Sequence, residues 1–166
     1  SPEALRQMGV QIGADVPFCL VGGTQLAEGI GEILTDLPSV PHAVFALVKP
    51  KADASTKVVY QGLQPTAFGT QYSKSFIRRL ASGQGWSDLA LELGNVLETV
   101  TAKLLPEVSE WKMRLFESGA LGVLMSGSGP TVFGVFADYE RAQEFQERWQ
   151  GHGQVILTHP VGRGIG

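Results

Sequence analysis

Two short apolar runs, joined by a connection rich in glycine and serine, constrain the fold of this chain more than any other feature. Residues 121–125 and 132–136 are rich in Val and Phe, which predicts two β-strands. The connection between them reads Ser126-Gly127-Ser128-Gly129-Pro130-Thr131. We therefore expect a hairpin at this point of the sequence.

The hairpin connection has two interpretations. Two glycines and two serines can form a loop that adopts positive φ and brings backbone N–H groups close to an anion such as a phosphate. Gly, Ser and Pro are also ordinary residues of a tight turn. A second, distant segment, Gly13-Ala14-Asp15-Val16-Pro17-Phe18, makes the phosphate interpretation more attractive.

Composition limits the size and class of the protein. The 166 residues suffice for one domain, or for one domain plus a piece of another, and 43% of them are apolar and 17% charged, as in a globular protein. The net charge is −3 without a Lys/Arg run, which argues against nucleic-acid and membrane partners. A single cysteine, Cys19, excludes an internal disulfide and fits a reducing compartment; we expect it to be a small core residue. The spacing of the three histidines suggests no metal site.

The order of elements predicts the fold class. From residue 43 onward we expect a strand over 43–48, helices, the two hairpin strands, a helix over 139–150 and a last strand over 154–158. This is the split β-α-β order of an α+β, ferredoxin-like sandwich. Residues 87–118 read as largely helical, with Pro106 as the break, and residues 61–70 as a loop. Trp111 and Trp149 are expected to pack in the core.

The first forty residues look like part of something else. A helix over residues 2–11 presents Leu5, Met8 and Ile12 on one side, and nothing earlier in the chain faces it. Such a helix looks like the end of an element cut from a larger domain. Pro38 and Pro41 then form a stiff connector, which is the best candidate for a domain boundary.

Several separated motifs together resemble the GHMP family of small-molecule kinases. Residues 13–18 and 125–130 match the second half of such an enzyme. Residues 27–32, 55–60 and 95–98 follow in the order and spacing of those members that phosphorylate a cytidyl-diphosphate-linked alcohol in the non-mevalonate isoprenoid pathway. The resemblance covers essentially the whole chain. It implies that residues 1–40 end the N-terminal kinase domain and that residues 41–166 form the C-terminal, ferredoxin-like domain.

The resemblance also implies roles for particular residues. Asp15 matches the catalytic aspartate, which orients the acceptor hydroxyl or takes its proton. Thr56 and Tyr60, one helical turn apart, match positions that hold the cytosine. Three residues of the hairpin connection should shape the loop behind the nucleotide phosphates; they are Gly127, Ser128 and Gly129.

The family also carries a glycine- and serine-rich phosphate loop and an early lysine, and neither is recognisable in these residues. We therefore expect a C-terminal fragment that is inactive alone, and an intact enzyme that uses ATP and Mg²⁺ on a small-molecule cytidyl-diphosphate substrate. The expected location is the cytoplasm or the plastid stroma. Two alternatives stay open: another GHMP kinase with an acceptor such as homoserine or mevalonate, and a non-catalytic ferredoxin-like binding module.

Overall fold

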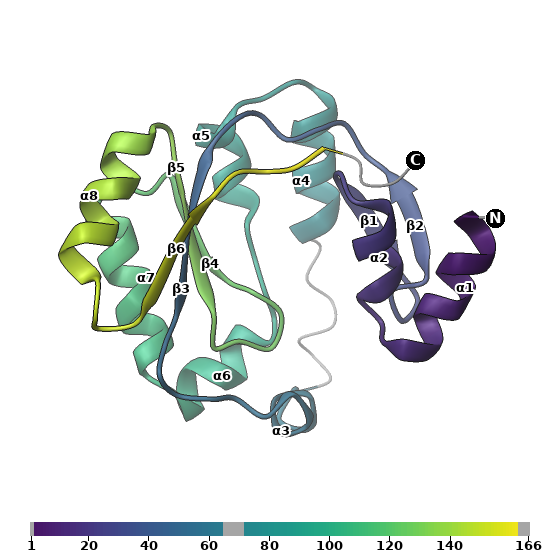
Figure 1. Ribbon diagram of the computed structural model, residues 1–166, viewed down its shortest axis with the longest axis horizontal. Helices are drawn as coiled ribbons and strands as arrows, with labels where there is room; N and C mark the ends of the chain where they lie inside the picture. Colours follow the sequence, from purple (N-terminus) through teal and green to yellow (C-terminus); the bar gives the residue numbers. More distant parts are fainter. Residues whose placement is uncertain (1, 65–71, 163–166) are drawn as a thin grey trace. The chain divides into compact units, whose positions relative to one another are not determined.

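The computed structural model describes residues 2–64 and 72–162 (Figure 1). The described chain forms two compact units. One consists of residues 2–41 and 160–162, and the other of His42–His159. The division falls directly after Pro41, and the chain returns to the first unit at Pro160. There the Gly23 N–H donates to the Gly162 carbonyl at 3.2 Å.

The first unit contains two helices and a small hairpin. Helix α1 (Pro2–Ile12) is followed by α2 (Val16–Val21), and strand β1 (Gln25–Glu28) pairs antiparallel with β2 (Ile33–Asp36). Gly9 lets the two helices approach, because a Cβ there would lie 3.0 Å from Cγ1 of Val16. The apolar side expected on α1 is open in the described chain, where Leu5, Met8 and Ile12 are 53%, 62% and 80% exposed.

The expectation that Cys19 is a small core residue is wrong. The side chain is exposed rather than part of a core. The short helix α2 turns Val16 and Leu20 toward Gly9 of α1 and buries Pro17. Cys19 and Phe18 therefore lie on the other side of the same helix, where the described part of the unit provides no cover.

The second unit is built on a four-stranded antiparallel sheet. Its strands are β3 (Val44–Lys49), β4 (Gly122–Met125), β5 (Val132–Phe136) and β6 (Gln154–Thr158). They lie in the order β4-β5-β3-β6, so that the first strand of the unit pairs with both the third and the fourth. With its helices, this is the split β-α-β arrangement, and the prediction of an α+β, ferredoxin-like sandwich is confirmed.

Helices cover both faces of this sheet (Figure 1). Helices α7 (Glu107–Glu117) and α8 (Tyr139–Trp149) lie on one face. On the other face, Trp86 packs edge-on against Phe45 of β3, with ring centroids 5.5 Å apart. The remaining elements of the unit are α3 (Thr56–Gln61), α4 (Tyr72–Ala81), α5 (Trp86–Leu89), the 3₁₀ helix η2 (Ala90–Glu92) and α6 (Glu98–Leu104).

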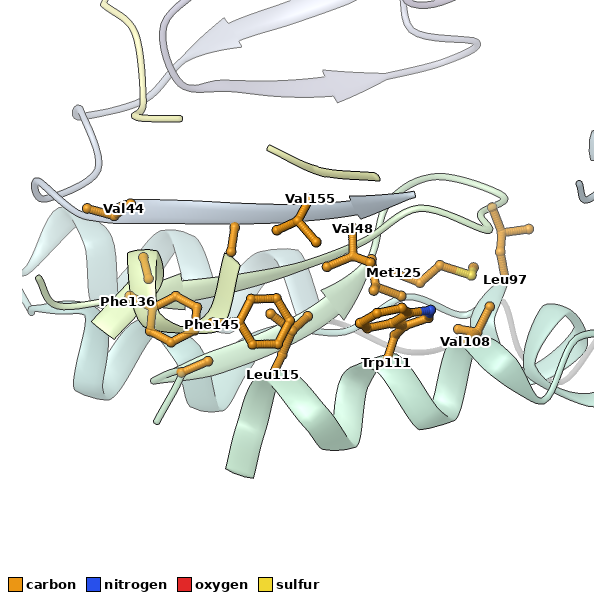
Figure 2. Close-up of a cluster of buried hydrophobic side chains, with 14 of the residues drawn as sticks. Val44, Val48, Leu97, Val108, Trp111, Leu115, Met125, Phe136, Phe145 and Val155 are labelled. Atoms are coloured by element: carbon orange, nitrogen blue, oxygen red, sulfur yellow. The ribbon is translucent and has the colours of Figure 1, made fainter. Parts of the chain in front are cut away.

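The main core lies between the sheet and helices α7 and α8 (Figure 2). Alternate residues of β3, Val44 and Val48 among them, point into it, as the period of two in a strand requires. Trp111 of α7 and Phe145 of α8 fill the space from the helical side. Trp149 is half-buried and packs edge-on against Trp111 at 5.7 Å. The expected packing roles of both tryptophans agree with this structure.

The long helical stretch expected from residue 87 onward is wrong in its first half. The chain forms the short α5, one turn of η2 and an irregular segment before α6 begins at Glu98. Leu93 already has extended backbone angles, and Gly94 lies where a Cβ would come within 2.3 Å of the Tyr72 ring. The apolar spacing that suggested one continuous helix comes from separate pieces, and Leu104 is 52% exposed.

The expected loop over residues 61–70 lies mostly outside the described residues, since α3 ends at Gln61 and residues 65–71 are not described.

Candidate functional site

The start of helix α3 touches the hairpin connection. Oγ1 of Thr56, the first residue of the helix, lies 2.9 Å from Oγ of Ser128. The two residues belong to motifs that the sequence assigned to different ligands, the acceptor and the nucleotide phosphates. The structure therefore brings two of the expected site residues into one place within the second unit.

Tyr60 lies one turn further along α3 and is 57% exposed. Residues four apart share a face of a helix, so Tyr60 and Thr56 lie on the same side of α3. Val59 is fully buried and anchors the helix to the core. The Tyr60 ring is thus available to a ligand rather than used in packing. Ser55 occupies the N-cap position of α3, and its side chain makes no capping hydrogen bond.

The hairpin connection adopts the backbone conformation that its glycines suggested. Gly127 and Gly129 have φ values of +55° and +80°, in the region that favours glycine. The Ser126 N–H donates to the Thr131 carbonyl at 2.8 Å, and the Gly129 N–H donates back to the Ser126 carbonyl at 2.9 Å. These bonds close residues 126–130 into a compact loop, which we call the hairpin loop.

Two side chains form hydrogen bonds to the backbone carbonyls at the hairpin loop, and neither of them was named as a site residue in the sequence analysis. Nδ2 of Asn95 donates to the carbonyl oxygens of Met125 and Gly127 at 2.9 and 2.7 Å. The hydroxyl of Thr101, a fully buried residue, lies 3.1 Å from the Ser128 carbonyl oxygen. The motif of residues 95–98 was the signal that could have indicated this role, because it contains the only asparagine of the chain.

Glu98 supports the end of the adjoining strand. Its Oε2 accepts a hydrogen bond from the Met125 N–H at 3.2 Å, and its Oε1 pairs with Nζ of Lys112 on α7. Both charged side chains are only about one-fifth to one-quarter exposed, at 20% and 24%. This contact connects α6, α7 and the last residue of β4 at the base of the hairpin loop.

In the first unit, Asp15 stands at the N-cap of α2. Its side chain is exposed and makes no capping hydrogen bond, while its carbonyl accepts from the Cys19 N–H at 3.1 Å. A second loop packs against this turn: a Cβ on Gly31, whose φ is +111°, would lie 2.5 Å from the Ala14 carbonyl oxygen. Two of the sequence motifs, residues 13–18 and 27–32, are therefore in contact within this unit.

Two kinds of feature were sought in the described residues, a cluster of metal ligands and a helix able to cross a membrane. No group of three or more His, Cys, Asp or Glu residues is arranged there to hold a metal ion. His42 and His159 stack at the ends of β3 and β6, and Nδ1 of His159 lies 3.2 Å from the Ala43 carbonyl oxygen. Within residues 2–64 and 72–162, no helix has the length and apolar character needed to cross a membrane.

Comparison with known proteins defines the class. The family described as GHMP kinases C terminal matches residues 77–155, which extend from α4 to β6 of the second unit. The second unit therefore contains a GHMP kinase C-terminal domain, and the resemblance inferred from the motifs is confirmed.

Within that family, the chain is similar to one kind of kinase. It is 45% identical over 162 residues to the 4-diphosphocytidyl-2-C-methyl-D-erythritol kinase of Pelotomaculum thermopropionicum, covering 95% of this chain and 55% of that protein. The corresponding enzyme of Geobacter metallireducens is 46% identical over 143 residues, covering 86% and 49%. The chain thus spans about half the length of the curated relatives it matches.

Solved structures also superpose on this chain. A crystal structure of 4-(cytidine 5'-diphospho)-2C-methyl-D-erythritol kinase superposes with a TM-score of 0.77 at 31% identity, covering 95% of this chain and 57% of that one. Homoserine kinase from Cytophaga hutchinsonii superposes with a TM-score of 0.69 at 22% identity, covering 89% and 51%, and this likeness concerns the fold.

Proposed function

We propose that the full-length gene product containing this chain transfers the γ-phosphoryl group of ATP to the 2-hydroxyl of 4-diphosphocytidyl-2-C-methyl-D-erythritol. The observation that carries the proposal is the contact between Thr56 and Ser128 at 2.9 Å. It joins the helix that resembles the cytidyl-binding element of these kinases to the glycine-rich hairpin loop. The identity of 45% to a kinase named for this substrate supports the choice of acceptor.

Asp15 is the proposed catalytic carboxylate. Transfer of a phosphoryl group to an alcohol requires that the hydroxyl be oriented and lose its proton as the new P–O bond forms and the bond to ADP breaks. The Asp15 carboxylate is exposed and has no capping bond to break before it meets a hydroxyl. It lies on a glycine-flanked turn, where a substrate can approach closely.

Thr56, Tyr60 and Ser128 are the proposed acceptor contacts. A tyrosine ring offers an apolar face on which a pyrimidine can stack, and stacking of this kind is sequence-tolerant and worth about 1–3 kcal/mol per base. The Thr56 hydroxyl lies on the same side of α3 and supplies a polar contact beside the ring. Gly127 and Gly129 keep the loop backbone close to the ligand, as expected of residues that support the phosphates.

ATP is the proposed phosphoryl donor, and Mg²⁺ its companion ion. Mg²⁺ neutralises charge on the transferred phosphates in this reaction class. The described residues provide no set of ligands for a protein-held metal, so no step is assigned to the ion through this chain. We propose a cytoplasmic location, which fits the single free cysteine.

The proposal is tested by offering several acceptors to the full-length gene product. With ATP and Mg²⁺ present, ADP release is measured with 4-diphosphocytidyl-2-C-methyl-D-erythritol, with homoserine and with mevalonate at equal concentrations. We expect turnover with the cytidyl compound and a preference of about 10³-fold or more in kcat/KM, since a site that hydrogen-bonds a base rejects ligands lacking it. Comparable turnover with homoserine would assign the chain to another acceptor class, and no turnover with any acceptor would favour a binding module.

A further inference from the structure

Both polar atoms of the Asn95 side chain form hydrogen bonds, one with the hairpin loop and its adjoining strand and the other within the turn that contains Asn95. Nδ2 donates to the carbonyl oxygens of Met125 and Gly127, with N···O distances of 2.9 and 2.7 Å. Oδ1 accepts from the Leu97 N–H at 3.0 Å, just before α6 begins. The partners determine the orientation of the amide, because two carbonyls require the nitrogen and one N–H requires the oxygen.

The bond to Gly127 controls the direction of the next peptide group. A trans peptide is planar and places its C=O and the following N–H on opposite sides. Holding the Gly127 oxygen toward Asn95 therefore turns the Ser128 N–H away from Asn95. The Ser128 carbonyl, one residue on, lies 3.1 Å from the buried hydroxyl of Thr101, whose single proton also has the Leu97 carbonyl as an acceptor at 3.2 Å.

Ser128 is thus held by a peptide contact on each side, and its hydroxyl meets Thr56. The chain of contacts runs from Asn95 through the hairpin loop to the first residue of α3. The other side chains in this series, those of Thr101, Ser128 and Thr56, are short. A change at Asn95 is therefore transmitted to the position of the Ser128 hydroxyl, although the Asn95 side chain bonds to Met125, Gly127 and Leu97 rather than to Thr56.

We propose that Asn95 is a positioning residue for the acceptor: it holds the hairpin loop so that the hydroxyls of Ser128 and Thr56 form one binding surface. The inference rests on the proposed function, because it assigns Thr56 and Ser128 to the acceptor. It goes beyond that function by giving Asn95, which is not among the proposed acceptor contacts, the role of holding the hairpin loop in place.

The test compares two Asn95 variants in the full-length gene product. Asn95→Asp retains the size and Oδ1 but loses both donors. Asn95→Ala removes the side chain without adding a charge that could repel a diphosphate, and also serves if the first variant folds poorly. Gln146→Glu is the matched control. Gln146 lies on α8, in the same unit but outside the hairpin loop, and its Nε2 donates to the Val155 carbonyl at 3.0 Å.

We expect the KM for 4-diphosphocytidyl-2-C-methyl-D-erythritol to rise about tenfold in both Asn95 variants, which corresponds to the loss of about one well-placed hydrogen bond. The KM for ATP should change less than about twofold. Gln146→Glu should leave both KM values unchanged, even where its thermal midpoint falls as far as that of the Asn95 variants. A KM for the acceptor that is unchanged in both Asn95 variants, or rises only in parallel with that for ATP, would overturn the proposal.

A double variant tests the route of the effect. If Asn95 acts through the surface that Ser128 and Thr56 share, adding Thr56→Val to Asn95→Asp should raise the KM for the acceptor by no more than about twofold beyond the larger single effect. Effects that multiply would show that Asn95 acts elsewhere.

A binding measurement separates this inference from the proposed function. If the wild-type protein is inactive with every acceptor, the proposed function is contradicted. The inference is then tested separately by measuring the affinity for cytidine 5'-diphosphate in a calorimetric titration. Binding that weakens about tenfold in both Asn95 variants but not in Gln146→Glu would support it. Equal binding by all of them, or none by the wild type, would overturn it.

Discussion

The hydroxyl oxygens of Thr56 and Ser128 lie 2.9 Å apart, although 72 positions separate them in the sequence. Either oxygen can donate, and only one proton lies between them. The proton of the other hydroxyl and the remaining lone pairs stay available to a ligand. The start of α3 and the hairpin loop, which are two separate motifs in the sequence, therefore present one polar surface.

The two glycines of the hairpin loop should differ in their tolerance of a side chain. A Cβ on Gly127 meets nothing within 4 Å, whereas a Cβ on Gly129 would lie 2.5 Å from Sδ of Met125 and 3.1 Å from Cγ2 of Thr101. We expect Gly127→Ala to lower the free energy of unfolding by about 1 kcal/mol, from the positive φ alone. Gly129→Ala should lower it by about 3 kcal/mol, because overpacking adds to the strain.

Urea unfolding of this chain and its two variants measures both values, with each glycine serving as control for the other. Equal losses would mean that Met125 and Thr101 do not crowd Gly129 in solution.

The contact of Glu98 with Lys112 and the Met125 N–H should be worth more than a surface ion pair. Glu98→Ala leaves a strand N–H and a partly buried ammonium group without their acceptor, so we expect a loss of about 2 kcal/mol in the free energy of unfolding. Glu110→Ala is the control, since Glu110 is 54% exposed and its pair with Arg114 spans 3.4 Å within one helix. That change should cost less than about 0.5 kcal/mol by the same chemical denaturation.

Removing the charge of Asp15 should affect turnover and not folding. In the full-length gene product, Asp15→Asn should lower kcat by ~10²–10⁴-fold, the usual contribution of a positioned acid–base group. The thermal midpoint should stay close to that of the wild type, because the Asp15 side chain makes no capping hydrogen bond. Glu144→Gln, an exposed change of the same chemical kind on α8, is the control. A variant that keeps more than half of the wild-type kcat would show that Asp15 is not catalytic.

Loss of the Tyr60 ring should weaken acceptor binding selectively. Tyr60→Ala should raise the KM for 4-diphosphocytidyl-2-C-methyl-D-erythritol about tenfold and leave the KM for ATP unchanged, whereas Tyr60→Phe should behave like the wild type. Tyr139→Ala removes a tyrosine of similar exposure, 51% against 57%, from α8 and should change neither constant. An equal effect of Tyr60→Ala on both substrates would contradict the proposed stacking role.

Short-range patterns predicted most of the fold. The last strand, Gln154–Thr158, agrees residue for residue with the range expected from the sequence, and Pro106 separates two helices as its missing N–H requires. The order of strands and helices after residue 43 was enough to predict the sandwich. The patterns failed at Leu93 and Gly94, where tertiary packing against Tyr72 overrides the helical spacing of the leucines.

The site was predictable only in part, for a physical reason. Thr56, Tyr60 and the hairpin loop follow from local motifs that resemble a family. The support by Asn95 and Thr101 depends on long-range contacts, in which one amide reaches carbonyls 30 and 32 positions away. Nothing in the spacing of residues along the chain encodes such a distance, so only the folded arrangement reveals which polar side chain holds the loop.

The division at Pro41 gives the two units different optical properties. All three tryptophans and all three tyrosines of the sequence lie in the unit from His42 to His159, and Trp111 and Trp149 lie at its packed centre and edge. The other unit carries the only thiol, the exposed Cys19. Intrinsic fluorescence therefore reports the unfolding of the second unit alone, while a dye attached to the thiol reports the first. One unmodified sequence thus allows each half of the chain to be followed separately during denaturation.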